Sequence, residues 1–398
     1  MNLELSEKYE PLFKRAYEDN EIDTFIITGG RFSAKSFTTS IAAGIFLRDF
    51  DYKILFTRYT MTAAKDSIIP EFLGGLEALK IADEFEVNID RIKHKTGGEV
   101  VFKGMKTSSG NQTAALKSLK GFNCLIVDEA EEMPNQKDFE KIQLSIRHPD
   151  KPNISILILN PATKEHWIHN KYFDEKGIKG GFNGVKDNVC YIHTSYLDCL
   201  EHVPQNILNE FDRLKEKRPK EYNNVVLGGW LDKAEGVIFD NWTTGKFDEV
   251  LPFIYGSDWG FANDPSTLIK VAIDEKKKLL YVEEKLYGKG MNTDQLRDAF
   301  TAVCGKSVII ADNSELRLIN ELRRSGLNIL PVHKKPGSIK SGINKMKNYN
   351  IVVCGNSPNL IKEFNQYCWV DKGTKEVPID DWNHGIDPIR YALTRLCP

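Results

Sequence analysis

Lys35 and Ser36 lie side by side in the stretch TFIITGGRFSAKSFTTS (24–40), a short distance after Gly29. Their order nearly matches the phosphate-binding loop G-x-x-x-x-G-K-[ST], whose backbone N–H groups and following helix N-terminus surround phosphate oxygens. We therefore expect Lys35 to reach the β- and γ-phosphates of a nucleotide and Ser36 to hold Mg²⁺. Ala34 stands where the pattern has its last glycine, at a cost of about 1–2 kcal/mol if that position needs a positive φ. A plain glycine-rich turn between a strand and a helix is the alternative.

Two adjacent acids, Asp128 and Glu129, follow the apolar run CLIV. An aspartate at the end of a buried strand suits the Mg²⁺ shell of a nucleotide, and the next acid suits a base that orients the attacking water. An acidic helix start after a core strand is the alternative. Because the loop and the acidic pair each follow an apolar strand in this order, the sequence favours a P-loop ATPase.

Three polar residues could complete the nucleotide site. Arg31 lies inside the loop and Arg58 ends the next strand, and either could stabilise charge in the transition state. For Arg58, a solvated strand end is an equal alternative. Asn160 follows the strand SILIL at its carboxyl end, where ligands bind in such sheets, and could sense the γ-phosphate. An ordinary Asn-Pro turn competes with that interpretation.

Three aspartates mark a second candidate site. Asp258 ends FIYGSD, Asp312 ends SVIIAD, and Asp387 lies in NHGIDPIRYAL at an expected helix start. Aspartates that end neighbouring strands converge at one edge of a sheet, where they can hold two divalent metals ~4 Å apart for attack on a phosphodiester. For Asp387, a helix cap is the alternative. His384 could assist the leaving group or simply pack.

Three other acids and one basic segment give weaker signals. Asp264 is expected to be a turn residue, and Asp380 and Asp381 could add to the metal site or solvate a loop. The segment HKKPGSIKSG (333–342) could contact backbone phosphates, with a solvated loop as the alternative.

The elements that would position the first site form an α/β pattern. Apolar strands are expected at 24–28, 53–58, 124–127 and 154–159, with a helix after the loop, a helix across 61–80 and a hairpin over 85–104 that turns at Gly97-Gly98. Short apolar runs separated by helical patterns predict a buried, mostly parallel sheet. Residues 205–225 are predicted to be helical.

The second site has a different order of elements. A strand at 253–258 and the hairpin 266–287 come before helices and strands that alternate to the end of the chain, which is the outline of a ribonuclease-H-like domain. Glycines at 228, 229 and 236 mark a boundary. We expect an ATPase domain over 1–232, a linker over 233–246 and a nuclease domain over 247–398.

The bulk composition agrees with two soluble domains. The chain has 398 residues, 41% hydrophobic residues, 28% charged residues and a net charge of −2. Seven scattered cysteines argue against a disulfide framework or a zinc site. The polar, acidic N-terminus is unlike a signal peptide, so we expect a place in the host cytoplasm. Near-neutral charge requires any nucleic-acid surface to be local.

Together these motifs resemble the large terminase subunit of tailed bacteriophages. GGRFSAKS is similar to the family's loop, roughly G-G-R-G-S-[GA]-K-S, with Ala34 as a family variant and Phe32 as a departure. LNP at 159–161 resembles the coupling motif, and TSYLD and LGGW resemble the lead-in to the nuclease. SDWG, IIAD and NHGIDPIRYA are similar to the three nuclease signatures.

The resemblance implies a motor that pumps double-stranded DNA into a procapsid through a portal, fed by a small terminase subunit. It implies a ring of subunits during packaging, with a possible monomer in isolation and no membrane. ATP with Mg²⁺ would serve the motor. Two Mg²⁺ or Mn²⁺ ions would serve the nuclease, which cuts concatemeric DNA.

The resemblance also implies roles for single residues. The nucleotide would contact Gly29, Gly30, Arg31, Ser33, Ala34, Lys35, Ser36, Asp128 and Asn160. The catalytic residues would be Glu129, Arg31, Asp258, Asp312, Asp387 and His384. Ser36, Asp128, Asp258, Asp312 and Asp387 would be the metal ligands.

Two other classes of protein compete with this interpretation. A helicase-nuclease of DNA repair or defence would carry further helicase motifs, and no convincing second helicase core is found. A nucleotide-gated assembly protein would lack nuclease activity.

Overall fold

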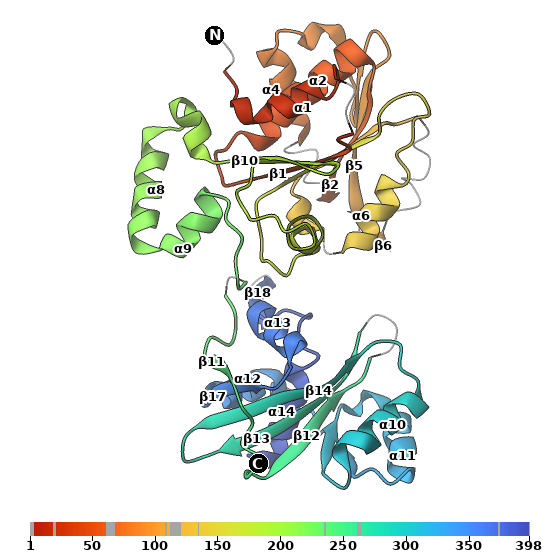
Figure 1. Cartoon of the computed structure of the whole chain (residues 1–398), viewed down its shortest axis with the longest axis vertical. Coiled ribbons are helices and arrows are strands. Elements are labelled where there is room, and N and C mark those ends of the chain that lie inside the picture. Colours follow the sequence, from red (N-terminus) through yellow and green to blue (C-terminus); the bar gives the residue numbers. More distant parts are fainter. Residues whose placement is uncertain are drawn as a thin grey trace. The chain divides into compact units, whose positions relative to one another are not determined.

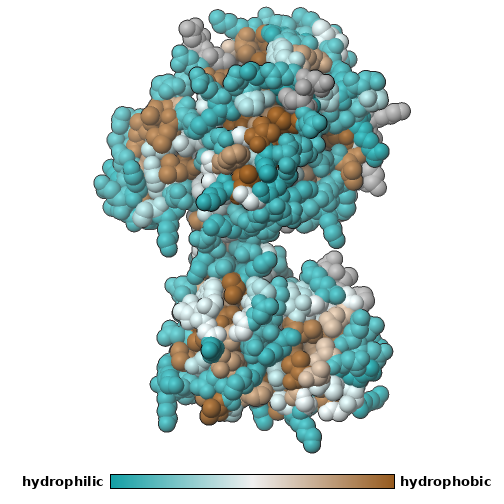
Figure 2. Space-filling model, in the orientation of Figure 1, coloured by the Kyte–Doolittle hydropathy of each residue, from teal (hydrophilic) through white to brown (hydrophobic). Residues whose placement is uncertain are grey.

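A computed structural model of the chain describes residues 4–18, 21–60, 68–107, 110–111, 121–133, 135–234, 236–260, 264–372 and 375–397. They fold into two compact units, Met1–Asp232 and Lys233–Pro398 (Figure 1). The visible surface of each unit is mostly hydrophilic, with apolar side chains in small groups (Figure 2). No helix among the described residues has the length and apolar character needed to cross a membrane.

Unit 1 is built on one mostly parallel sheet with the strand order β3-β4-β5-β2-β7-β8-β1-β10-β9, and β6 pairs with β5. The six strands from β5 to β10 in this order run parallel, whereas β3, β4, β6 and β9 pair antiparallel. The strands are β1 (Thr24–Gly29), β2 (Lys53–Thr60), β3 (Phe85–Val87), β4 (Arg91–His94), β5 (Glu99–Thr107), β6 (Gly110–Asn111), β7 (Cys124–Val127), β8 (Ile154–Leu159), β9 (Gly184–Lys186) and β10 (Val189–Thr194). Every residue of β1, β7 and β8 is buried, as parallel strands covered on both faces require.

Helices cover both faces of this sheet. Helices α1, α2 and α4 lie on one face and α6 on the other (Figure 1). Alternate strand residues divide between the two faces, so that Phe25 and Ile27 pack with α2 while Ile26 packs with α6. The helices are α1 (Glu10–Lys14), α2 (Lys35–Phe50), α4 (Ile69–Ala78), α6 (Gln136–Gln143), α7 (Trp167–His169), α8 (Gln205–Lys217) and α9 (Pro219–Glu221). Short 3₁₀ or π turns are η1 (Glu7–Tyr9), η3 (Ala82–Glu84), η4 (Ala130–Glu132), η5 (Asn170–Asp174), η6 (Tyr196–His202) and η7 (Tyr222–Val226).

The end of unit 1 is a helical segment with a small core of its own. Phe211 and Leu214 of α8 pack with Tyr196, Tyr222 and Val226. This segment also touches the loop after β1, because the Arg31 backbone N–H donates to the Val225 carbonyl at 2.8 Å. The predicted helical stretch 205–225 is thus confirmed, and it supports the loop directly.

Unit 2 contains a mixed sheet with the order β11-β17-β14-β13-β12-β15-β16. β12, β13 and β14 form an antiparallel meander, and β15 and β16 continue parallel to β12. The hairpin of β13 and β14 is the one that the sequence predicted over 266–287. The strands are β11 (Trp242–Gly245), β12 (Phe253–Asp258), β13 (Ser266–Asp274), β14 (Leu279–Gly288), β15 (Ile309–Ala311), β16 (Ile329–Pro331) and β17 (Asn350–Cys354). A separate hairpin joins β18 (Trp369–Lys372) to β19 (Lys375–Pro378).

The helices of unit 2 lie on opposite faces of its sheet. Residues of α10 and α11 share a core with Leu268, whereas residues of α12, α13 and α14 share a core with Ile269 and Val271. The helices are α10 (Thr293–Cys304), α11 (Leu316–Arg324), α12 (Ser338–Lys347), α13 (Pro358–Gln366) and α14 (Ile386–Leu396), with a 3₁₀ turn η8 (Asn313–Glu315).

The structure corrects the expected linker and adds strands that the sequence did not reveal. Much of 233–246 belongs to unit 2, because Ile238 and Phe239 are buried in its core and β11 pairs with β17. β9, β10, β18 and β19 were not foreseen. Of the helix expected over 61–80, α4 forms the latter part, and residues 61–67 lie outside the described residues.

Candidate functional site

The first site begins where β1 ends and α2 starts, as expected for a phosphate-binding loop. Ala34, the residue before α2, adopts φ +54°, so it carries the left-handed strain that a glycine would avoid. Phe32 also has a positive φ, of +55°, and its ring packs edge-on against Phe211 of α8. Gly30 is required by close approach, since a Cβ there would lie 1.9 Å from the Val226 carbonyl oxygen. The loop conformation is therefore fixed partly by the helical segment behind it.

Lys35 points back into the loop and connects it to the end of β8. Its Nζ donates to the carbonyls of Gly29 (3.1 Å) and Gly30 (2.8 Å), to Ser33 Oγ (3.0 Å) and to Asn160 Oδ1 (3.0 Å). Burial lowers the pKa of Lys35 to about 8, although the charges of Glu131 and Asp128 oppose that shift. Lys35 and Asn160, far apart in sequence, thus meet at one point.

The acidic pair after β7 faces the start of α2. Ser36 Oγ donates to Asp128 Oδ1 at 3.0 Å, so the two predicted Mg²⁺ ligands of this site are in contact. Burial raises the pKa of Asp128, with Arg58, Ser36 and Lys35 opposing it. The Arg58 guanidinium lies 3.9 Å from Asp128 and forms an ion pair with Glu129. Arg58 thus faces the carboxylates and is not a solvated strand end.

The predicted nucleotide residues line one cavity of about 550 Å³. Its walls include Gly30, Arg31, Ser33, Ala34, Lys35, Ser36, Asp128, Glu129 and Asn160. Gly29 contributes through its carbonyl, which accepts from Lys35. The Arg31 side chain is exposed at the rim.

Two carboxylates of this site were missed in the sequence. Glu71 on α4 lines the same cavity, and burial raises its pKa to about 7. Glu131, two residues after Glu129, accepts from Asn160 Nδ2 at 3.2 Å, and burial raises its pKa to about 7 as well. Glu131 could have been predicted from the sequence because it lies two residues after Glu129. Glu71 could not, because only the packing of α4 brings it to the site.

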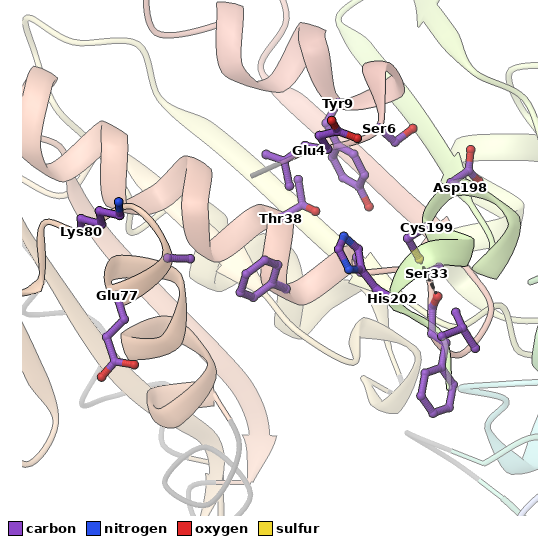
Figure 3. Close-up of a pocket in the computed structure, with 16 residues that line it drawn as sticks. Glu4, Ser6, Tyr9, Ser33, Thr38, Glu77, Lys80, Asp198, Cys199 and His202 are labelled. Atoms are coloured by element: carbon purple, nitrogen blue, oxygen red, sulfur yellow. Dashed lines mark hydrogen bonds between the residues drawn. The ribbon is translucent and has the colours of Figure 1, made fainter. Parts of the chain in front are cut away.

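A second cavity, of about 610 Å³, lies beside the loop (Figure 3). It shares Phe32, Ser33 and Ala34 with the first, and its other walls include Tyr9, Phe37, Thr38, Cys199, His202 and Val203. Cys199 Sγ donates to the Phe32 carbonyl at 3.0 Å. Its surface is mostly apolar, in contrast to the first cavity, although the charged residues Glu4, Glu77, Lys80 and Asp198 also line it.

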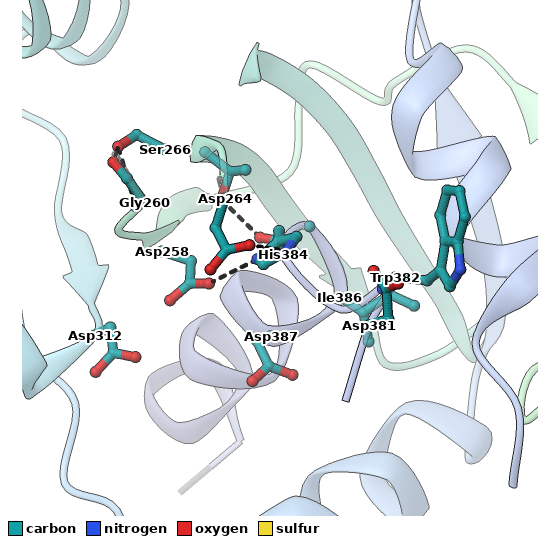
Figure 4. Close-up of polar contacts among 12 residues, drawn as sticks. Asp258, Gly260, Asp264, Ser266, Asp312, Asp381, Trp382, His384, Ile386 and Asp387 are labelled. Atoms are coloured by element: carbon teal, nitrogen blue, oxygen red, sulfur yellow. Dashed lines mark hydrogen bonds and ion pairs between the residues drawn. The ribbon is translucent and has the colours of Figure 1, made fainter. Parts of the chain in front are cut away.

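The second site brings together the three predicted aspartates of unit 2 (Figure 4). Asp258 ends β12, Asp312 follows the neighbouring strand β15, and Asp387 lies in the first turn of α14. The Tyr391 hydroxyl lies 3.3 Å from both Asp312 Oδ2 and Asp387 Oδ2. Helix α14 can approach β12 because Gly256 has no side chain, and a Cβ there would lie 1.9 Å from the Pro388 carbonyl oxygen.

Each of these aspartates has a basic partner. Lys334 Nζ lies 2.7 Å from Asp312 Oδ2, Arg390 Nε donates to Asp387 at 3.0 Å, and His384 Nδ1 lies 3.6 Å from Asp258. Burial raises the pKa of Asp258 to about 6, and the neighbouring charges of Asp387 and Asp312 add to the effect. Burial acts against ionisation of Asp312, but the contacts with Lys334 and the Ser314 N–H outweigh it and lower that pKa.

His384 and the weaker acids have distinct surroundings. Burial opposes protonation of His384, but Asp258, Glu363 and Asp264 outweigh it and raise the pKa of the imidazole. Asp264 lies 3.6 Å from His384 Nε2, so it belongs to this cluster and is more than a turn residue. Asp381 accepts from the Trp382 N–H, a local turn contact.

The donor set suits divalent cations, although it is not closed around an ion. Among the described residues, no three His, Cys, Asp or Glu side chains stand close enough together to hold one metal ion. The carboxylates of Asp258, Asp312 and Asp387 come from three elements, and burial, with a smaller effect of the other two charges, raises the pKa of Asp258. Oxygen donors of this kind are those that Mg²⁺ and Mn²⁺ prefer.

Glu363 is a buried carboxylate that the sequence did not reveal. It lies on α13 with no exposed surface, and its two oxygens accept from the backbone N–H groups of Gly385 (2.8 Å) and Ile386 (3.0 Å) and from Tyr287 Oη (3.0 Å). Burial raises its pKa to about 7. Glu363 therefore holds the turn between His384 and Asp387.

Comparison with known proteins agrees with both units. The sequence model described as phage terminase large subunit matches residues 21–229, and the one described as terminase RNAseH like domain matches 258–395. The PBSX phage terminase large subunit of Bacillus subtilis (strain 168) is 23% identical over 394 residues, covering 92% of this chain and 89% of that protein.

Two solved structures span almost the whole chain. The large terminase of bacteriophage HK97 is 10% identical, covers 99% of this chain and 96% of its own, and has a TM-score of 0.52, which supports the fold. The large terminase of a thermophilic bacteriophage is 18% identical, covers 99% of this chain and 100% of its own, and has a TM-score of 0.47. With an α/β ATPase unit and a ribonuclease-H-like unit in this order, the chain belongs to the phage terminase large subunit family.

Proposed function

We propose that this protein translocates double-stranded viral DNA into a procapsid by hydrolysing ATP, and cuts concatemeric DNA with a metal-dependent endonuclease. The observation that carries the proposal is the convergence of Lys35, Ser36, Asp128 and Asn160 on one cavity. Its counterpart in the other unit is the group of three aspartates, of which Asp312 and Asp387 both contact the Tyr391 hydroxyl.

In the motor, the loop would bind the ATP phosphates through its backbone N–H groups and Lys35. The Lys35 ammonium would give up the carbonyls of Gly29 and Gly30 and bind phosphate oxygens instead. Asn160, at the end of β8, would sense the γ-phosphate. Ser36 and Asp128 would hold Mg²⁺, which would neutralise phosphate charge. Glu129 would leave Arg58 and orient the attacking water, and Arg31 or Arg58 would stabilise the transition state.

The aromatic cavity beside the loop suits the nucleoside half of ATP. It adjoins the phosphate cavity through Phe32, Ser33 and Ala34, and its apolar walls would cover a purine ring. Contact with the purine would then explain why a phenylalanine stands at position 32 of the loop.

In the nuclease, Asp258, Asp312 and Asp387 would hold two Mg²⁺ or Mn²⁺ ions. These ions would supply an activated water and stabilise the leaving oxygen. His384, whose pKa is raised by its carboxylate neighbours against the effect of burial, would give a proton to the leaving oxygen. Glu363 would fix the positions of His384 and Asp387 by holding the backbone between them.

The proposed partners are double-stranded DNA, the portal of a procapsid and a small terminase subunit. We propose a ring of copies during packaging, in the cytoplasm of the host. These assignments rest on the family to which the chain belongs.

The test is packaging of linear DNA into purified procapsids, measured as DNA protected from DNase. Wild-type protein with ATP should protect full-length DNA. Lys35→Ala should protect none, because it loses the phosphate-binding cation, whereas Asp258→Ala should protect linear DNA normally, since no cut is needed. Packaging by a folded Lys35→Ala protein at the wild-type rate would reject the motor assignment.

A further inference from the structure

A cavity of about 660 Å³ in unit 2 has lining residues that contact Asp312 and Asp387, and it is not used by the mechanism above. Its walls are the segment after β16, the side of α12 that faces α14, and the last turns of α14. The segment after β16 is the basic stretch 333–342 that the sequence singled out.

The cavity is strongly basic in a chain whose net charge is −2. Its lining includes Lys334, Lys335, Lys345, Arg390 and Arg395. None of the residues around it, all of them within the described part of the chain, is acidic. Ser338 and Ser341 add hydroxyl groups on the same side of α12.

The basic side chains of the cavity differ in whether they already contact another group of the protein. Arg390 is buried and held by Asp387, and Lys345 donates to the Cys397 carbonyl at 2.5 Å. Lys335 and Arg395 are exposed, and neither forms an ion pair within the described residues. These two side chains can therefore bind an anion without first breaking a contact.

The cavity is joined to the aspartates by shared side chains. Lys334 lines it and contacts Asp312 at 2.7 Å, and Tyr391 lines it while its hydroxyl lies 3.3 Å from both Asp312 and Asp387. A strand whose scissile phosphate reached these carboxylates would therefore bring its neighbouring phosphates close to this cavity.

We propose that this cavity, the phosphate cleft (Lys334, Lys335, Ser338, Ser341, Lys345 and Arg395), binds backbone phosphates of the DNA strand beside the bond that is cut. Lysine, arginine and serine are side chains that contact phosphates without reading sequence, so the cleft positions the strand and leaves sequence choice to other parts. Lys334 can exchange Asp312 for a phosphate oxygen, which frees that carboxylate for its role in cleavage. The inference rests on the proposed nuclease function.

The experiment uses the full chain with Lys335→Glu/Arg395→Glu. The matched control is Lys306→Glu/Arg324→Glu, which makes the same charge change at exposed positions before β15 and β16, at the opposite end of these strands from Asp312 and Lys334. Cleavage of duplex DNA with Mn²⁺ is measured against DNA concentration at about 50 and 200 mM salt. Binding of a labelled duplex in EDTA is measured by fluorescence anisotropy, with ATPase rate and melting temperature as checks on folding.

The cleft variant should raise KM for DNA at least roughly tenfold, with kcat near the wild-type value. Its slope of log KM against log salt should be smaller by about two, since each lost phosphate contact removes about 0.9. Binding in EDTA should weaken in the same direction, and the control should match wild type. If the glutamate variant melts early, Lys335→Ala/Arg395→Ala should still show the KM effect.

A cleft variant with the KM and salt slope of the control would overturn the inference. A rise in KM that is independent of salt would overturn it too, since phosphate contacts must be screened. If wild-type protein fails to cut at all, the proposed nuclease function fails first, and the two failures are thus distinguished.

Discussion

At the scale of single residues, both sites pair their charged groups internally. Lys35 is surrounded by oxygen acceptors, Arg58 is paired with Glu129, and Lys334 is paired with Asp312. Each pair keeps a group that must meet phosphate, water or metal in a defined place. Function then requires exchange of partners, and because these side chains are already ordered, little further side-chain entropy is lost.

The lowered pKa of Lys35 predicts that nucleotide affinity depends on pH. Only the ammonium attracts phosphate, and because its pKa is about 8, the charged fraction falls as pH rises through that value. The dissociation constant for ATP should therefore rise by up to about tenfold per pH unit above pH 8. Calorimetric titration with ATP from about pH 7 to about pH 9.5 measures this.

Lys35→Arg is the control, because its guanidinium stays charged across that range. Its affinity for ATP can be lower at neutral pH but should change little as the pH rises. A wild-type affinity that stays constant to about pH 9.5 would show that Lys35 does not titrate there or does not meet the phosphates.

Glu129→Gln should bind ATP and hydrolyse it slowly. The amide keeps the shape of the side chain but loses the basic oxygen, an effect commonly worth about 10²–10⁴ in rate. Glu132→Gln, at an exposed position in the same turn, should hydrolyse ATP at the wild-type rate. ATP binding and steady-state turnover measure the two steps. Normal turnover in Glu129→Gln would show that another acid of this site, such as Glu131 or Glu71, orients the water.

At the scale of secondary-structure elements, strand ends determine most of both sites. The sequence identified β1, β7, β8, β12 and β15 because apolar runs that end in Gly, Asp or Asn mark buried strands in α/β folds. The aspartates of unit 2 could be grouped for that reason. Helix packing was less accessible, and so Glu71 on α4 and Glu363 on α13 were missed.

Glu363 illustrates why the rest was not predictable. In NLIKEFNQ it has the appearance of a solvated helix residue, yet it is fully buried beneath the turn before α14. Its role depends on a contact between elements separated in sequence, whereas Arg390 and Tyr391 lie one turn from Asp387 and could have been found by helical spacing. β11 was likewise invisible, because it becomes a strand only through pairing with β17.

Glu363→Gln should destabilise the start of α14 and impair DNA cutting. All its partners are donors in this structure, so an amide group would face at least one N–H and lose about 1–3 kcal/mol. Cutting rate and the Mn²⁺-induced rise in melting temperature should both fall, while ATP hydrolysis should be retained. Glu376→Gln, at an exposed position of β19, is the control.

The pH dependence of the Glu363 effect has a defined sign. Its pKa in the folded chain, about 7, exceeds the ordinary value of 4.5, so its contribution to stability is fully present below about pH 4.5 and is lost as pH rises through 7. Replacement by glutamine should remove this component, making the melting temperature less dependent on pH between about 5 and 8. An unchanged pH profile would mean that Glu363 is already ionised throughout this range.

At the scale of the whole molecule, the chain has two units with separate cores, and each carries one candidate site. The order of motifs along the sequence was sufficient to assign an ATPase unit before a ribonuclease-H-like unit, and both assignments are confirmed by the family matches. The chemistry of each site should then be separable by single substitutions. Coupling between the units would act on packaging and need not affect either reaction alone.

The most direct test of that claim measures ATP hydrolysis and Mn²⁺-dependent plasmid cutting in wild type, Lys35→Ala and Asp258→Ala under the same conditions. Lys35→Ala should lose hydrolysis and keep cutting, because the aspartates of unit 2 are untouched. Asp258→Ala should keep hydrolysis and lose cutting, because removal of one carboxylate weakens metal binding and misplaces the attacking water. Melting temperatures would show that both variants are folded. Cutting at the wild-type rate by a folded Asp258→Ala protein, or hydrolysis at the wild-type rate by Lys35→Ala, would contradict the account.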